Sequence, residues 1–365
     1  MHPNQHLNPL SSYTLKHLPQ DFIVIERASL NLLDQGSYLY IQCTKQERST
    51  MEIASYLAKI LGIKEKDVGY AGTKDTHAIT TQYFSLREIK SQRLTNLKIS
   101  NVDLKIIGYG QTPLSLGDLE GNHFQITLRN LNTNVSFPHL SIPHLSLSPN
   151  YFDEQRFSQH NIEVGRALLK KDFKKAATII DHASCQEYIT THPTNPIAAL
   201  RTLPDRLLRL YLNAYQSYLW NETVGMYLQQ HSKEIYTSPY SAGSLIFIKD
   251  QERFIHLQFP LLGFATLQSP DPQIQHALST ILQRENLTAT DFVIRQLPNL
   301  SLEGEMRSVF VRVEDLKVGE YDSDECFEGK YKLKVCFFLP KGSYATMFMR
   351  RLFMDESISY THLSH

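Results

Sequence analysis

The residues best suited to chemistry lie in the segment Gly72–Asp75, a Gly-Thr-Lys-Asp turn predicted between two apolar, β-prone runs. Such a turn holds the carboxylate of Asp75 at the edge of a sheet, and a cation beside it, such as Lys74, favours the charged form. An exposed, ionised carboxylate can act as a nucleophile, and a flanking glycine lets a large substrate approach the backbone. The same pattern also fits an ordinary β-turn whose aspartate caps the next segment.

Sequence patterns typical of a bound nucleotide or metal are missing. In the turn, Asp75 follows the lysine where a phosphate-binding loop needs Ser or Thr. Gly108 and Gly110 begin like a dinucleotide fingerprint, but Pro113 stands where the third glycine belongs. The 15 histidines form neither an HExxH nor a Cys/His zinc pattern, and there is no GxSxG elbow. The sequence therefore predicts neither a cofactor nor a metal.

Composition indicates a globular, cytoplasmic protein. The four cysteines, which are widely spaced and typical of reduced thiols, are Cys43, Cys185, Cys326 and Cys336. We expect no signal peptide and no membrane association, because no apolar run approaches the roughly 18–20 residues of a membrane span. With 37 basic and 37 acidic residues the net charge is zero, which is mild evidence against a nucleic-acid partner.

Local clusters of basic residues keep a nucleic-acid partner open, because a basic face is enough to contact phosphates. The clusters are Lys170, Lys171, Lys174 and Lys175; Arg201, Arg206 and Arg209; and Arg350 with Arg351. Each cluster taken singly also fits a solvated helix face.

Periodicity along the chain predicts an α+β fold. Strands are expected at 21–26, 37–43, 78–86, 104–109, 122–130 and 332–337, and a β-like interlude at 244–259. A helix is expected from about Ser49, with Glu52 completing a capping box, and long amphipathic helices at 161–183 and 203–230. Shorter helices are expected at 271–283 and 345–353. Alternating strands favour a mixed, mainly antiparallel sheet with helices on one face.

The order of these elements predicts two domains. Strand character occurs at both ends of the chain and helical character in the middle, and residues 131–149 are rich in Asn, Ser, Pro and His. We therefore expect a sheet domain built from 1–147 and 306–365, with residues 148–305 inserted as a mostly helical second domain.

Five segments together make the sequence resemble the TruD-type tRNA pseudouridine synthases. They are Gly72–Gln82; Pro19–Glu26 with the upstream Lys16; Gly121–Phe124; Pro149–Phe157; and Leu339–Thr346. The sequence departs from the family pattern where Asp153 and Ser158 replace glycines, which should alter a turn rather than the chemistry. Tyr344 stands where relatives commonly have Phe, and it keeps a stacking face.

The resemblance implies a cofactor-free isomerase that acts on tRNA. Enzymes of this family convert uridine 13 of tRNA to pseudouridine: the C1′–N1 bond breaks, the uracil turns, and C5 bonds to C1′. The fold implied is a pseudouridine-synthase sheet domain with an inserted TRUD-type domain, and no obligate protein partner is evident. RNA would bind in a cleft between the two domains, with the basic clusters at Lys170–Lys175 and Arg201–Arg209 on its far side.

The resemblance also assigns roles to six residues. Asp75 matches the catalytic aspartate, and Lys16 is the first choice for its cation, ahead of Lys74. The flipped uracil would stack on Phe124, with Phe22 and Tyr344 as further walls, and Asn122 would hold its polar edge. Stacking returns about 1–3 kcal/mol of the few kcal/mol that base flipping costs. From periodicity alone Phe124 is a core residue, because it alternates with Ile126 and Leu128.

Two other functions stay open at this point. One is a pseudouridine synthase that acts on a different RNA. The other is a non-catalytic RNA-binding module with the same fold, against which the intact Lys-Asp turn and the Asn122–Phe124 pair argue.

Overall fold

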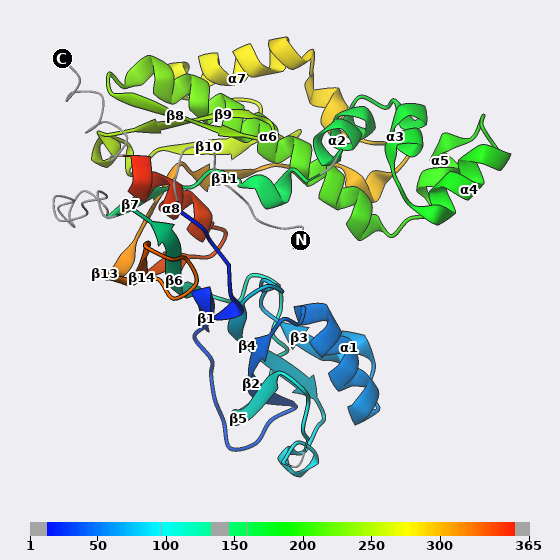
Figure 1. Cartoon of the computed structure of the whole chain (residues 1–365). Helices are drawn as coiled ribbons and strands as arrows, with labels where there is room; N and C mark the ends of the chain where they lie inside the picture. Colours follow the sequence, from blue (N-terminus) through cyan, green and yellow to red (C-terminus); the bar gives the residue numbers. More distant parts are fainter. Residues whose placement is uncertain (1–12, 96, 133–145, 159, 355–365) are drawn as a thin grey trace, which may run out of the picture. The chain divides into compact units, whose positions relative to one another are not determined.

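The computed structural model describes residues 13–95, 97–132, 146–158 and 160–354 of the chain (Figure 1). These residues form two compact units. Among the described residues, the first is built from residues up to Ser146 together with Arg312–Ala345, and the second from Leu147–Val311 together with residues 346–354. Each unit is therefore discontinuous in sequence. The expected division into domains at 147/148 and 305/306 stays a prediction, and part of the predicted boundary region, 133–145, lies outside the described residues.

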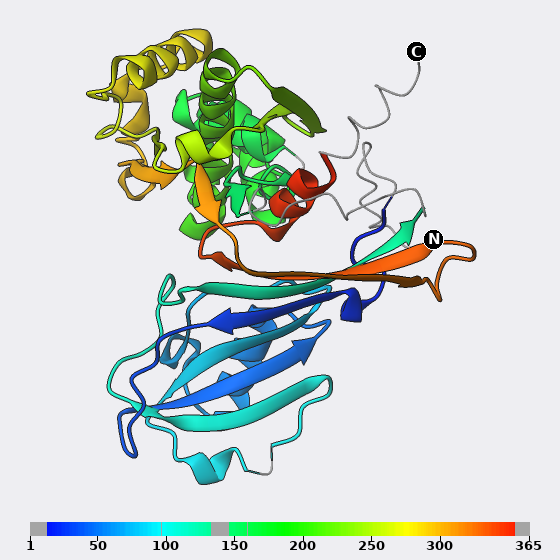
Figure 2. The same cartoon turned by 90° about the vertical axis from the view of Figure 1, so that its left-hand side faces the viewer.

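The first unit is an eight-stranded sheet, whose strands lie side by side in Figure 2. Its strands are β1 (Phe22–Arg27), β2 (Tyr38–Gln46), β3 (Val68–Tyr70), β4 (Ile79–Arg87), β5 (Val102–Gly110), β6 (Gly121–Leu131), β13 (Glu314–Ser323) and β14 (Tyr331–Pro340). The order is β13-β14-β6-β1-β4-β2-β5, with β3 paired to β4. β1 and β4 pair in parallel and the other named pairs are antiparallel. The α+β fold with a mainly antiparallel sheet is confirmed.

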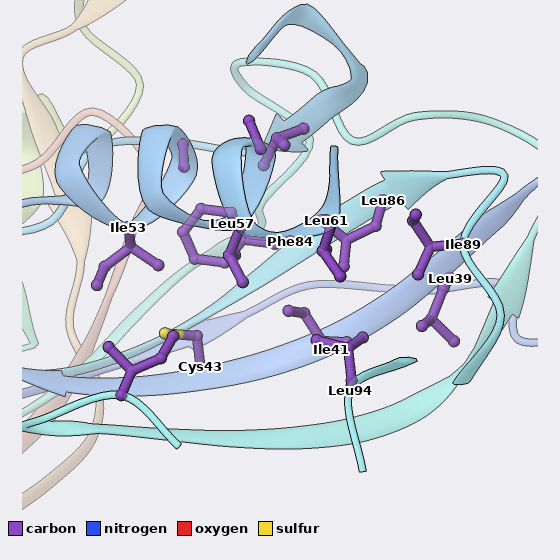
Figure 3. Close-up of a cluster of buried hydrophobic side chains, with 14 residues drawn as sticks. Leu39, Ile41, Cys43, Ile53, Leu57, Leu61, Phe84, Leu86, Ile89 and Leu94 are labelled. Carbon is purple, nitrogen blue, oxygen red and sulfur yellow. The ribbon is translucent and has the colours of Figure 1, made fainter. Parts of the chain in front are cut away.

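Helix α1 (Thr50–Leu61) covers part of one face of this sheet. It begins with the expected capping box, in which the Ser49 hydroxyl accepts from the Glu52 N–H and the Glu52 carboxylate accepts from the Ser49 N–H. Its buried stripe, which includes Leu57, packs on inward-facing side chains such as Ile41 and Phe84 (Figure 3). The left-handed Gly62 then ends the helix.

The second unit is mostly helical. Its helices are α2 (Asn161–Leu169), α3 (Phe173–Ile179), α4 (Ala183–Thr191), α5 (Pro196–Leu200), α6 (Asp205–His231), α7 (Pro272–Glu285) and α8 (Ala345–Met354). Three two-stranded sheets accompany them, formed by β7 (Leu147–Pro149) with β12 (Phe310–Arg312), β8 (Ile235–Tyr240) with β9 (Gly243–Ile248), and β10 (Gln258–Leu261) with β11 (Glu305–Ser308). Short 3-10 turns complete both units.

Helix α6 organises this second unit. It corresponds to the predicted helix 203–230, and its Trp220 is fully buried beside the rings of Tyr151 and Phe152. Gly165 of α2 lies so close to α6 that a Cβ there would come 2.1 Å from the Tyr211 carbonyl oxygen. In the described part of the chain, no helix has both the length and the apolar character needed to cross a bilayer.

The predicted single helix over 161–183 is wrong. The chain leaves helical geometry after Leu169, and Lys171 adopts a left-handed backbone with φ of 60°. Asp172 then caps a new helix, α3, because its carboxylate accepts from the Lys175 N–H at 3.1 Å. Both α2 and α3 bury apolar residues, so the apolar periodicity of the sequence continues from one helix into the next. The sequence pattern therefore does not reveal the break between them.

Candidate active site

The parallel pairing of β1 with β4 explains why two distant segments meet. Val24 on β1 lies opposite Thr80 on β4, and both strands run in the same direction. Segments that lead into parallel neighbours therefore arrive at the same edge of the sheet. Lys16 lies in the segment that leads into β1, and Asp75 lies in the segment that leads into β4.

The ammonium of Lys16 lies 3.3 Å from a carboxylate oxygen of Asp75. The two side chains are 20% and 30% exposed, so solvent or a ligand can still reach the pair. Lys16 Nζ also lies 4.1 Å from the centre of the Phe22 ring. The backbone of Lys16 is left-handed, with φ of 55°, which costs energy for a lysine and is typical of positions held by their surroundings. The segment is anchored by the paired backbones of Thr14 and Arg129.

Lys74 is engaged by a different carboxylate. Its ammonium pairs with Glu26 on β1, and the two side chains are only 5% and 0% exposed. The second Glu26 oxygen accepts from the backbone N–H of Tyr83 at 3.3 Å. Glu26 therefore holds Lys74 in a buried ion pair, and Lys16 is the cation found beside Asp75.

Three side chains fix the main chain of the Gly72–Asp75 turn. Thr50, on the first turn of α1, accepts from the Lys74 N–H at 2.9 Å and donates to Gln82 at 2.7 Å. Gln82 in turn donates to the Gly72 carbonyl at 3.2 Å. The ammonium of Lys45 donates to the Asp75 carbonyl at 3.0 Å. The turn is thus held to α1, β4 and β2 at once.

Sheet register places the predicted aromatic residues beneath this turn. Residues opposite each other on paired strands present their side chains on the same face. On one side of Val24, the neighbouring residue is Phe124 on β6, followed by Phe337 on β14. On the other side, the neighbouring residue is Thr80 on β4, followed by Lys45 on β2. This row crosses the sheet on the face that carries α1.

The aromatic rings are closely packed. Phe124 meets Phe22 edge to face, with ring centres 6.1 Å apart, and stacks on Phe337 at 5.4 Å. Phe22 is 2% exposed and Phe124 8%. In this structure both rings are therefore almost completely covered by the protein. Phe337 extends the group and was not singled out from sequence, where it is one apolar residue in an alternating strand.

Asn122 and Tyr344 lie toward the other end of β1. Asn122 is opposite Glu26 and, on its other side, opposite Leu339 of β14. Its side-chain oxygen is enclosed and accepts no hydrogen bond from the described residues, so it can accept from an N–H that enters the site. Tyr344 is half-buried in the segment between β14 and α8. Pro340, which precedes Tyr344 in the chain, lies opposite Gly121 in the pairing of β14 with β6.

Burial shapes the ionisation of two groups next to the turn. Burial lowers the pKa of Lys45 to about 8, against the smaller opposing effect of Asp75 and other anions. Burial also raises the pKa of Cys43 to about 12, which makes this thiol unreactive. Among the described residues, no group of three or more His, Cys, Asp and Glu side chains could hold a metal.

Sequence reasoning missed Lys45, Thr50 and the role of Glu26. A weak signal for Lys45 exists: it continues the inward-facing alternation of Ile41 and Cys43, where an apolar residue is expected. A charged residue at such a position must find polar partners. Neither Thr50 nor Glu26 carries a comparable signal, because a helix start and a strand end are ordinary places for these residue types.

The basic clusters of the second unit are largely engaged within the protein. Lys171 donates to the carbonyls of Thr290 and Asp291, and Lys175 pairs with Glu163. Arg201 and Arg209 donate to the Gln296 and Asn299 carbonyls, respectively. Lys170 and Lys174 are exposed.

Comparisons with known proteins agree along the whole chain. Residues 9–187, 182–254 and 245–352 match the model of the family described as tRNA pseudouridine synthase D (TruD). A probable tRNA pseudouridine synthase D 2 of Methanocaldococcus jannaschii is 31% identical, over 93% of this chain and 91% of the relative. The tRNA pseudouridine synthase D of Aquifex aeolicus is 27% identical, over 94% and 98%.

A solved structure agrees with these matches. The crystal structure of a putative tRNA pseudouridine synthase D (TruD) from Methanosarcina mazei aligns with a TM-score of 0.69 at 25% identity. The alignment covers 95% of this chain and 94% of that one. The chain therefore belongs to the tRNA pseudouridine synthase D (TruD) family.

Proposed function

We propose that this chain converts uridine 13 of tRNA to pseudouridine, with Asp75 as the nucleophile. The observation that carries the proposal is the partly exposed Lys16–Asp75 pair at the edge of an aromatic group. The pair places a carboxylate, a group able to act as a nucleophile, where a ligand can reach it, with a cation at 3.3 Å. The names of the relatives, which specify tRNA and pseudouridine synthesis, support the substrate and the reaction class.

The reaction is an isomerisation that needs no cofactor. The Asp75 carboxylate attacks either the ribose C1′ or the uracil ring, and the C1′–N1 bond breaks. The uracil turns while held, C5 bonds to C1′, the bond to Asp75 breaks and restores the free carboxylate, the C5 proton is lost, and N1 gains a proton. Atoms and charge therefore balance within the substrate and one exchanged proton.

The other predicted residues serve base flipping and retention of the detached uracil. Asn122 is suited to the uracil N–H groups because its enclosed side-chain oxygen is an acceptor. Phe124, with Phe22 and Tyr344, supplies the aromatic wall. Because Phe124 is only 8% exposed, stacking requires its side chain or a neighbour to move on binding, as interface side chains commonly do.

Tritium release from tRNA labelled at C5 of uridine tests the proposal directly. The wild-type protein should release tritium, and Asp75→Asn should lose the rate by several orders of magnitude while its tRNA affinity, measured by filter binding, stays within a few-fold. Asp103→Asn, the same change at an exposed position of β5, is the matched control and should keep the rate. A wild-type rate for Asp75→Asn would exclude Asp75 as the nucleophile.

The position of the modified uridine needs its own substrate. A transcript with cytidine in place of uridine 13 should give no tritium release, whereas the parent transcript does. Equal release from both transcripts would contradict uridine 13 as the target.

A further inference from the structure

Lys45 is a buried lysine whose hydrogen bonds converge on the turn. It lies near the end of β2, only 1% exposed. Its ammonium donates to the Arg48 carbonyl at 2.6 Å and to the Asp75 carbonyl at 3.0 Å. Lysine is almost never fully buried, because removing its charge from water is costly. A neutral residue of similar size would fill the same space without that cost, so the charge itself calls for a role.

The position of Lys45 relative to Asp75 suggests that role. Lys16 meets the carboxylate from the partly exposed side, whereas Lys45 binds the backbone carbonyl of the same residue from within the sheet face. The two cations therefore act on different atoms of Asp75. The carbonyl bond fixes where the Asp75 main chain lies, and the charge adds to the positive potential around the carboxylate.

We propose that Lys45 is a positioning residue for Asp75, holding its main chain in place and placing a second positive charge near its carboxylate. The inference rests on the proposed role of Asp75 as the nucleophile. Lys45 touches no substrate atom in this scheme and acts only through Asp75.

The groups around Lys45 define how it should titrate. Burial is the largest influence and lowers its pKa to about 8. Asp75 in the turn and Glu52 on α1 oppose that shift, whereas Lys74 in the turn adds to it. Cys43 on the same strand would oppose it only as a thiolate, and its own pKa of about 12 keeps it neutral where Lys45 titrates. Lys45 is therefore charged below about pH 8 and loses its proton above it. The Asp75 carboxylate favours the cationic form of Lys45, so removal of the Asp75 charge should lower the pKa of Lys45 further.

The first experiment uses this coupling and does not depend on activity. Lysine labelled with ¹³C at Cε is titrated by NMR in the wild-type protein and in Asp75→Asn, with the Lys45 signal assigned by its loss in Lys45→Met. We expect a Lys45 pKa near 8 that falls further in Asp75→Asn. An ordinary lysine pKa, or the same pKa in both proteins, would overturn the inference whether or not the protein modifies tRNA.

The second experiment measures what the position and charge do for the reaction. Lys45→Met keeps the side-chain length and removes both the charge and the donors. Displacing a catalytic group by about 1 Å can cost about 100-fold in rate, so kcat should fall by that order while KM changes little. Leu57→Ala, a cavity in the α1 core, is the control for loss of stability, and thermal melting of each variant establishes that it is folded.

The pH profile separates positioning from simple structural support. Wild-type and Leu57→Ala kcat should both fall as the pH rises through about 8, because Lys45 loses its charge there. The kcat of Lys45→Met should not show this fall at high pH. An unchanged kcat, or the same fall at high pH in Lys45→Met, would contradict the role of Lys45 while leaving Asp75 as the nucleophile. Absence of tritium release from the wild-type protein would instead contradict the proposed function.

Discussion

Two ion pairs occupy the Gly72–Asp75 turn, and their burial separates their roles. The Lys74–Glu26 pair is almost completely enclosed, whereas the Lys16–Asp75 pair is 20% and 30% exposed. A substrate can reach only the second pair. Removing either partner of an enclosed pair leaves a buried charge without a counter-charge, which is far more costly than breaking a surface pair.

Stability measurements should therefore distinguish the enclosed pair from an exposed one. Glu26→Gln alone should lower the free energy of unfolding by about 3–5 kcal/mol, because Lys74 stays buried and charged. The double variant Glu26→Gln/Lys74→Met should recover most of that loss. Urea unfolding of Glu26→Gln, Lys74→Met and the double variant gives the coupling free energy between the two side chains. A loss of stability in the double variant equal to the sum of the two single losses would mean that the two side chains do not interact.

The control for this cycle is an exposed pair made by the next residue of β1, Arg27. Glu120→Gln removes one of the two carboxylates that pair with Arg27, in a pair whose side chains are 46% and 37% exposed, while Glu314 remains. Its effect should stay within about 1 kcal/mol.

At this scale the sequence predicted part of the site. Asp75 and Lys16 were both named, and the structure brings them together, although their chemical roles stay predictions. Lys45 could not be predicted, because its function depends on a carbonyl contributed by a segment 30 residues away. Side-chain type alone does not show which main-chain group a lysine will meet.

At the scale of elements, the start of α1 and the middle of β4 act as a clamp on the turn. Thr50 is 1% exposed and links the Lys74 N–H to Gln82, which holds the Gly72 carbonyl. The hydroxyl is therefore both donor and acceptor within a buried network. Such networks keep a loop in one conformation as long as every member is satisfied.

Substituting the clamp should impair both stability and rate. Thr50→Val keeps the shape but leaves the Lys74 N–H and Gln82 without their partner, at a cost of about 1–3 kcal/mol. The rate of tritium release should fall as well, because the turn carries Asp75. Thr50→Ser keeps the hydroxyl and is the control. Thermal denaturation measures stability, and tritium release at a temperature where all variants are folded measures the rate. Equal stability and equal rate for Thr50→Val and Thr50→Ser would show that the Thr50 hydroxyl does not hold the turn.

Elements with a strong local signal were predictable, and those set by backbone conformation were not. The capping box at Ser49 and the alternation along β6 depend on neighbouring residues. The break at Lys171 depends on a left-handed backbone that many residue types can adopt when the tertiary structure requires it. The parallel β1–β4 pairing is equally hidden, since alternation says nothing of strand direction or order.

At the scale of the whole molecule, a chain of zero net charge must concentrate its positive charge locally to bind RNA. Several basic residues of the second unit are occupied by contacts within the protein, Lys171 and Lys175 among them. Lys170, Lys174 and Lys175 are the exposed members of their cluster, and of these Lys175 is paired with Glu163, which leaves Lys170 and Lys174. They are therefore the better candidates for phosphate contacts.

The salt dependence of tRNA binding tests these two lysines. Each lost phosphate contact reduces the slope of log K against log salt by about 0.7–0.9. Lys170→Ala/Lys174→Ala should therefore flatten the slope by roughly 1.4–1.8 in total. Lys64→Ala/Lys66→Ala, which removes two exposed lysines from the first unit, is the charge-matched control. Identical slopes for the two double variants would show that Lys170 and Lys174 lie on a solvated face.

The parallel pairing of β1 with β4 has a consequence for how the chain can change in length. Lys16 and Asp75 meet through strand register, so residues added to the connections that follow β1 or α1 leave their meeting point unchanged. One residue inserted in the middle of β1 would instead turn the side chains on one side of the insertion to the opposite face, so that Phe22 and Glu26 could no longer share a face. Length variation within the family is therefore expected in the connections and excluded from the short stretches that enter and form these two strands.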